Sequence, residues 1–153
     1  MVRKINLTPI GYVDASVTEP ADENWGNVTS RINLLPEYKG SMSGLENFSH
    51  VIVVTYLHRA KYIPSRHLRR RPRGMRSMPE VGIFSQRVKD RPNPIGVTAV
   101  KIISVGDLYI DVRGLDAINV TPVLDIKPYF PQFDKIESPQ VPDWVNKLMK
   151  NYF

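Results

Sequence analysis

The chain has 153 residues, 42% of them apolar, and its 21 lysines and arginines against 15 aspartates and glutamates give a net charge of +6. This length suits one domain with its own hydrophobic core and makes a second independent domain unexpected. The absence of cysteine excludes disulfides, cysteine-ligated zinc and iron–sulfur clusters. The excess of positive charge favours a polyanionic partner, and nucleic acid is the obvious candidate.

No segment of the sequence has the pattern of a membrane span or a signal peptide. The longest apolar run, Val51–Val54, is far too short to cross a bilayer, and polar residues interrupt the apolar ones that follow the basic start, Met1–Lys4. We therefore expect a soluble, cytoplasmic protein without membrane attachment.

The 13 prolines and the many short apolar runs favour a β-rich fold with many turns, a small barrel or sandwich, over a helical bundle. The first half of the chain predicts a strand over Ile5–Val13 broken near Pro9, a loop over Ala15–Asn27, a strand over Arg31–Leu35, a turn over Gly40–Gly44, a helical turn over Leu45–Ser49 and a strand over His50–His58. The second half predicts a basic loop over 65–78, strands through Val81–Phe84 and Ile95–Ile102, strands over Leu108–Val112 and Val123–Ile126, an irregular segment over Pro128–Pro142 and a C-terminal helix over 142–152.

Three of these elements carry specific expectations. The strand over His50–His58 is a β-branched run without polar alternation, which predicts burial on both faces and a histidine at each end. Trp25, expected to be exposed in its loop, is either a lid over an edge of the core or a stacking platform for a ring. The C-terminal helix places Trp144, Leu148 and Tyr152 on one face, which indicates a packing element.

The loop over 65–78 contains most of the excess positive charge and has little to bury. Its simplest interpretation is a solvated, mobile loop, and the alternative is a segment that docks on phosphates and orders on binding. The arginines that we expect to contact RNA are Arg66, Arg69, Arg70, Arg71 and Arg73, together with Arg91 further along the chain.

A turn-rich connection holds two more arginines between the strands on either side of it. Pro92 and Pro94 fix their own φ angles and keep Arg91 and Asn93 out of the helical region. Binding and catalytic residues lie on the connections between strands more often than on the strands themselves, so Arg87 and Arg91 are candidates for binding an anion.

Several chemistries are absent from the sequence. It has no glycine pair after a strand of the dinucleotide-binding kind, no phosphate-binding loop with its lysine, and no nucleophile elbow. The only histidines, His50, His58 and His67, lack the spacing of a zinc hydrolase, so we expect no metal site.

What remains is a set of polar residues at strand ends. Each one also has an ordinary structural interpretation: a half-buried histidine, a turn cap or a surface ion pair. Together they offer an imidazole, guanidinium groups and a carboxylate that can accept both hydroxyls of a ribose, which suits a nucleoside-bearing ligand. The set comprises His58, Arg87, Arg91, Asn93, Asp116, Asn119, Asp125, Lys127 and Tyr129.

Three motifs in this order, Gly44–His50 followed by His58, Gly82–Gly96 and Gly114–Tyr129, closely resemble the TsaA-like (YaeB, TrmO) family. Trp25–Gly26 and Val141–Val145 look most like archaeal members. The resemblance implies a small β-barrel, mainly antiparallel or mixed, with short helices and a single domain over 1–153. It also implies a homodimer that binds S-adenosylmethionine and methylates N6 of threonylcarbamoyladenosine beside the tRNA anticodon.

The resemblance carries the cofactor contacts of the family over to Leu57, His58, Arg87, Val97, Asp116, Ala117, Ile118 and Asn119, with the loop around Trp25 as a further contact. One departure concerns Asn119 and Val120, where the family usually has aspartate and glycine. We expect that valine cannot take the positive φ that glycine allows, so either this turn differs or the glycine is dispensable.

The resemblance also implies roles for the acceptor side. His58 or Asp125 would take the proton from the acceptor nitrogen, and Tyr129 would stack on or hydrogen-bond the acceptor base. Two alternatives stay open: the same cofactor with a small-molecule or protein acceptor, and a module that binds S-adenosylmethionine or RNA without catalysis.

Overall fold

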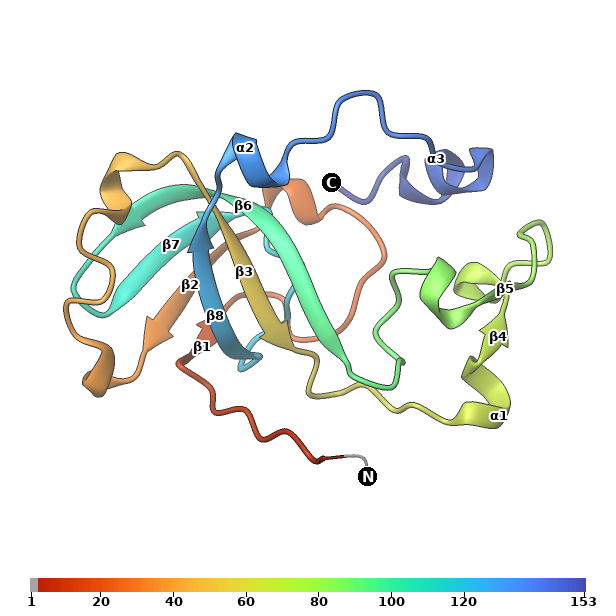
Figure 1. Cartoon of the computed structure of the whole chain (residues 1–153), viewed down its shortest axis with the longest axis horizontal. Helices are drawn as coiled ribbons and strands as arrows, with labels where there is room; N and C mark the ends of the chain where they lie inside the picture. Colours follow the sequence, from red (N-terminus) through yellow and green to blue (C-terminus); the bar gives the residue numbers. More distant parts are fainter. Residues whose placement is uncertain (1–2) are drawn as a thin grey trace.

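The computed structural model describes residues 3–153 and consists mainly of a closed antiparallel barrel (Figure 1). The barrel order is β1-β2-β7-β6-β3-β8, and β1 closes onto β8. This architecture confirms the predicted small β-barrel. The barrel strands are β1 (Gly11–Asp14), β2 (Thr29–Leu34), β3 (His50–Tyr56), β6 (Ile95–Val105), β7 (Tyr109–Arg113) and β8 (Pro122–Pro128).

The connection between β3 and β6, residues 57–94, forms a small lobe beside the barrel, which we call the basic lobe (Figure 1). It contains helix α1 (Pro64–His67) and a two-stranded sheet of β4 (Arg69–Arg70) and β5 (Val81–Gly82). Two further short helices, α2 (Pro131–Asp134) and α3 (Asp143–Met149), follow β8. Short 3-10 turns occur at Trp25–Asn27, Pro36–Tyr38, Leu45–Asn47, Pro72–Gly74 and Ile83–Ser85.

The core lies inside the barrel and is built by alternation along its strands. In β3, Val51, Val53 and Thr55 are buried, whereas Ile52 and Val54 are only half-buried. The prediction that both faces of this strand are buried was therefore wrong, because a closed barrel has a single interior face. β-branched residues favour strand formation whether they face the core or the solvent, so the run of them predicted a strand but not the burial of both its faces.

Strand β6 is paired unevenly. Its first half, Ile95–Val100, pairs only with β3, and β7 joins it from Lys101 onward. One edge of the first half therefore has no neighbouring strand within the described chain. This open edge lies next to the basic lobe (Figure 1).

Several predicted boundaries need correction. The first strand begins at Gly11, since Ile5 and Leu7 lie outside it and are exposed. The expected strand through Val81–Phe84 is two residues long and turns into a 3-10 turn, which leaves Phe84 80% exposed.

Two further expectations changed with tertiary contacts. The segment 65–78 contains regular elements and internal hydrogen bonds instead of forming a bare loop. Trp25 is only 3% exposed, and its indole nitrogen donates to the carbonyl oxygen of Ala21 at 3.1 Å, so it is a buried packing residue. None of the helices within residues 3–153 has the length and apolar character needed to cross a membrane.

Candidate functional site

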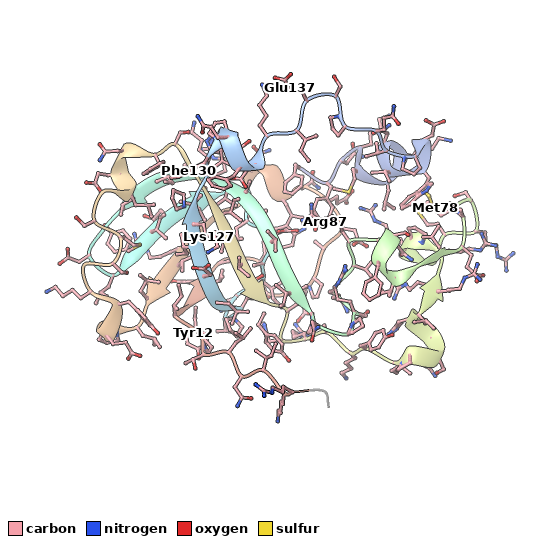
Figure 2. The ribbon with its side chains drawn as sticks, in the orientation of Figure 1. Tyr12, Met78, Arg87, Lys127, Phe130 and Glu137 are labelled. Carbon is pink, nitrogen blue, oxygen red and sulfur yellow. The ribbon has the colours of Figure 1, made fainter. Side chains whose placement is uncertain are left out.

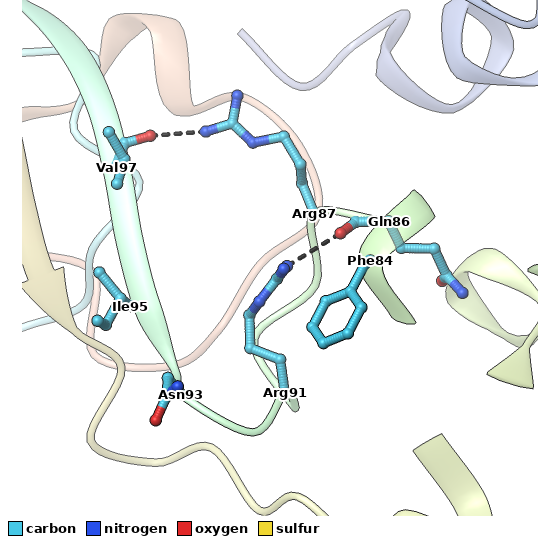
Figure 3. A pocket seen from close by; sticks show the side chains of 7 residues that line it. All are labelled: Phe84, Gln86, Arg87, Arg91, Asn93, Ile95 and Val97. Carbon is cyan, nitrogen blue, oxygen red and sulfur yellow. Dashed lines mark hydrogen bonds between the residues drawn. The ribbon is translucent and has the colours of Figure 1, made fainter. Parts of the chain in front are cut away.

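A groove of about 410 Å³ lies between the open edge of β6 and the end of the basic lobe (Figure 3). The strand supplies an apolar wall, and the lobe supplies two guanidinium groups and an exposed aromatic ring. The groove is lined by Phe84, Gln86, Arg87, Arg91, Asn93, Ile95 and Val97.

Each arginine of the groove is held by one backbone carbonyl. Arg87 Nη2 donates to the carbonyl oxygen of Val97 at 2.6 Å, and Arg91 Nη1 donates to that of Gln86 at 2.9 Å (Figure 3). A guanidinium has several N–H groups in a planar fork, so the remaining ones are available to a ligand. The predicted pair of anion-binding arginines therefore shares one groove.

The lobe around these arginines is braced by Asp90. Its Oδ1 accepts hydrogen bonds from the Lys61 backbone at 2.9 Å and from Lys89 Nζ at 3.0 Å, and Arg70 lies 3.8 Å from its Oδ2. Burial acts to raise the pKa of Asp90, but these donors and nearby positive charges outweigh it and hold the pKa below its ordinary value. The carboxylate thereby ties together the segments that form the lobe.

Asp116, in the turn between β7 and β8, contacts β6 at Thr98, one residue beyond Val97, whose carbonyl oxygen Arg87 contacts. Its Oδ1 accepts a hydrogen bond from the hydroxyl of Thr98, and its Oδ2 accepts one from the hydroxyl of Tyr152 at 2.8 Å. Burial, and then the negative charge of Asp116, raise the pKa of Tyr152 well above its ordinary value. The phenol therefore stays neutral and acts as a donor.

Leu57 and His58 follow β3 and adjoin the start of β6. The backbone N–H of Leu57 donates to the carbonyl oxygen of Pro94 at 2.7 Å. A Cβ at Gly96 would lie 3.2 Å from Leu57 Cδ2, so the two residues are in close contact. His58 is half-buried at this same end of the barrel, but it does not line the groove.

The turn after Asp116 uses its side chains for packing. Ala117 and Ile118 are buried, so a ligand there would contact the backbone. Asn119 Oδ1 accepts a hydrogen bond from the Ala15 backbone at 3.1 Å, and its own N–H donates to the Val17 carbonyl. The expectation that valine cannot take a positive φ here was wrong: Val120 has a φ of +58°, the left-handed conformation that glycine would adopt without strain.

The three candidate catalytic residues, His58, Asp125 and Tyr129, do not come together within one chain. Tyr129 lies beside His50, since its N–H donates to the His50 carbonyl at 3.1 Å and the two rings are 6.4 Å apart. His50 begins β3, whereas His58 follows its opposite end. Asp125 is paired with Lys127 at 2.7 Å, and this hydrogen bond raises the pKa of Lys127. Figure 2 shows Lys127 on the barrel and Arg87 between the barrel and the basic lobe.

Most of the predicted RNA-binding arginines already have partners inside the protein. Arg69 lies 3.7 Å from Glu80, Arg71 donates to the Met78 carbonyl, and Arg73 donates to the Asp22 carbonyl at 2.6 Å. Within residues 3–153, the side chain of Arg66 has no such partner, and neither has that of Arg76, a further arginine of this lobe. The described residues also contain no cluster of side chains suited to a metal ion.

Sequence reasoning missed Thr98 and Tyr152 as neighbours of Asp116. Thr98 is an ordinary strand residue by its pattern, and Tyr152 lies 36 positions from Asp116 along the chain. No local signal predicts either contact.

A second groove, of about 400 Å³ and mostly apolar, adjoins the first and shares Asn93 and Ile95 with it.

The chain is similar to proteins from archaea and mammals. A Methanothermobacter thermautotrophicus protein described as a probable S-adenosyl-L-methionine-binding protein is 38% identical over 87% of this chain and 96% of its own length. The human tRNA (adenine(37)-N6)-methyltransferase is 36% identical over 86% of this chain, which corresponds to 31% of the human protein.

The fold is also that of a protein of known structure. TrmO from Pseudomonas aeruginosa superposes with a TM-score of 0.77 at 26% identity, over 94% of this chain and 63% of the TrmO chain. The present chain thus spans less than two thirds of that protein. The family model for the tRNA-methyltransferase O N-terminal domain matches residues 17–135, most of the barrel and the whole basic lobe. These matches agree with the resemblance noted in the sequence motifs, and the chain belongs to the tRNA-methyltransferase O N-terminal domain family.

Proposed function

We propose that this protein is an S-adenosylmethionine-dependent methyltransferase that acts on tRNA, at N6 of threonylcarbamoyladenosine 37 beside the anticodon. The observation that carries the proposal is the convergence of Arg87 and Asp116 on Val97 and Thr98, two successive residues of β6. Relatives described as S-adenosylmethionine-binding proteins and as tRNA (adenine(37)-N6)-methyltransferases support the cofactor and the acceptor.

The donor set fits this cofactor. The planar fork of Arg87 suits the carboxylate of the methionine moiety, and the carboxylate of Asp116 can accept hydrogen bonds from both ribose hydroxyls. The groove of about 410 Å³ has the size of ordinary small-molecule sites. We assign the further contacts to the backbone of Leu57 and Val97 and to the turn that follows Asp116.

When bound, the cofactor supplies a methyl group on a positively charged sulfur. The residues of the chain would hold N6 of the acceptor in line with that methyl group and would take up the proton that N6 loses. The protein therefore has to align donor and acceptor and exclude water, without a covalent intermediate. We propose His58 as the base, since Asp125 is ion-paired with Lys127.

We also propose that the working unit is a homodimer. Tyr129 and His58 lie at opposite ends of β3, so one chain cannot present both to the same base. A second copy would supply the missing residue. Mixing inactive His58→Ala and Tyr129→Ala variants tests this, because recovered activity requires sites shared between subunits, and no recovery contradicts it.

The function itself is tested by incubating the purified protein with methyl-labelled S-adenosylmethionine and bulk tRNA. The expected result is label in methylated threonylcarbamoyladenosine after digestion to nucleosides. Label in a protein or small-molecule fraction would favour another acceptor. Cofactor binding by calorimetry without any transfer would indicate a binding module instead of an enzyme.

A further inference from the structure

The segment that follows α3 is fixed against the 3-10 turn at Trp25–Asn27. The backbone N–H groups of Asn24 and Trp25 donate to the carbonyl oxygens of Asn151 and Tyr152, both at 2.8 Å. A Cβ at Gly26 would lie 2.6 Å from the carbonyl carbon of Phe153, so only glycine permits this close approach. Backbone contacts of Tyr152 itself and of its two neighbours, Asn151 and Phe153, therefore fix the position of Tyr152.

This placement directs the Tyr152 hydroxyl at the carboxylate of Asp116. A neutral phenol has a single proton to donate, and here it goes to Oδ2 at 2.8 Å. The hydroxyl of Thr98 donates to Oδ1. One donor on each oxygen fixes the plane of the carboxylate, which otherwise rotates with little restraint.

We propose that Tyr152 is a positioning residue that orients Asp116 for the ribose of S-adenosylmethionine. A carboxylate oxygen can accept more than one hydrogen bond, so both oxygens keep capacity for the two vicinal ribose hydroxyls while Tyr152 and Thr98 hold them in place. This inference rests on the proposed function, because it requires that Asp116 bind the ribose.

A Tyr152 hydroxyl that blocked the ribose site would change the affinity for the cofactor in the opposite direction. If the phenol occupied the position of a ribose hydroxyl, the cofactor would have to displace it, and its removal would tighten binding. The sign of the change in affinity therefore separates a positioning residue from a blocking one.

The test is calorimetric titration of S-adenosylmethionine into the purified protein and into Tyr152→Phe, which keeps the ring and removes the hydroxyl. We expect Kd to rise about fivefold to tenfold, less than for the full loss of a hydrogen bond to a charged group, because Asp116 keeps its charge and loses only its fixed orientation. Activity at saturating cofactor should fall by less than twofold, because the phenol touches neither the methyl group nor its acceptor. Tyr12→Phe, on the exposed face of β1, is the matched control and should leave Kd unchanged.

Coupling to Asp116 is measured in the Asp116→Ala background, where Tyr152→Phe should change Kd by less than twofold. Thr98→Val removes the other donor, keeps the side-chain shape, and should weaken binding to a similar extent, which preserves the test if Tyr152→Phe does not fold. Unchanged or tighter binding by Tyr152→Phe would overturn the inference alone. A wild-type protein that binds no S-adenosylmethionine would instead overturn the proposed function.

Discussion

Arg87 and Asp116, 29 positions apart by their residue numbers, meet at one stretch of β6: the guanidinium of Arg87 donates to the carbonyl oxygen of Val97, and the carboxylate of Asp116 accepts from the hydroxyl of Thr98. This meeting depends on the open edge of β6, because a neighbouring strand along Ile95–Val100 would occupy the Val97 carbonyl. The incomplete pairing of a single strand thus creates the room for the groove.

Arg87→Lys should weaken binding of S-adenosylmethionine about tenfold. Lysine keeps the charge but loses the planar fork that contacts the Val97 carbonyl and a ligand carboxylate together. Calorimetric titration measures the change in Kd, with Arg113→Lys on the exposed end of β7 as the matched control. A Kd that does not change in Arg87→Lys would remove this residue from the proposed site.

Val120→Gly should stabilise the protein by about 1 kcal/mol, which is a rise in Tm of about 2–4 °C for a chain of this size. The reason is the φ of +58°, which a β-branched residue adopts only with strain, while the 59% exposure of Val120 means that little burial is lost. Thermal unfolding measures the effect.

Val141→Gly is the control for this substitution, because Val141 is comparably exposed, at 48%, and has no positive φ. It should gain nothing, since glycine then only adds entropy to the unfolded chain. Equal changes in Tm for the two variants would show that backbone strain at Val120 is not the cause.

The sequence predicted those parts of the site whose geometry is local. Pro92 and Pro94 restrict their neighbours wherever the chain goes, so the arginine-bearing connection was recognisable. The short apolar runs and turn residues predicted a small barrel or sandwich, and the family resemblance implied the barrel. The contact between Tyr152 and Asp116 was not predictable, because it depends on how the segment after α3 packs against residues 24–26.

Two expectations differ from the arrangement within one chain for the same reason. Trp25 was expected to be exposed because its neighbours in the sequence are polar, yet residues far along the chain cover it. His58 and Tyr129 were grouped because both end apolar strands, but the antiparallel pairing of β3 with β8 puts them at opposite ends. Residue type and spacing report which side chains are available, and strand direction decides which of them meet.

Arg66 and Arg76 should contribute more to RNA binding than Arg71 and Arg73. Within residues 3–153 the first two have no side-chain partner, so their N–H groups can face phosphates, whereas the other two donate to backbone carbonyls. The Arg66→Ser/Arg76→Ser double variant should weaken tRNA binding and lower the slope of log K against log salt by about 1 to 2.

Filter binding between about 50 and 200 mM salt measures that slope. The Arg71→Ser/Arg73→Ser variant serves as the comparison, and it should lower the Tm more than it lowers the affinity for RNA. The reverse ranking of the two double variants would mean that the internal contacts open when RNA binds.

Asp90→Asn should destabilise the protein at neutral pH but not in acid. The pKa of Asp90 is lowered in the folded protein, so the unfolded chain binds its proton more readily, and this contribution to stability is complete above the ordinary carboxylate pKa of about 4. It is lost as the pH falls through the lower, folded-state pKa.

Urea unfolding of the wild-type protein and Asp90→Asn from pH 7 down to about pH 3 measures the difference in stability, which should shrink with acid because Asp90 is then protonated in the wild-type protein. Asp111, whose pKa is lowered mainly by its hydrogen bond from Arg31, titrates equally in both proteins and cancels from the difference. A difference that stays constant across this range would mean that the charge of Asp90 does not stabilise the basic lobe.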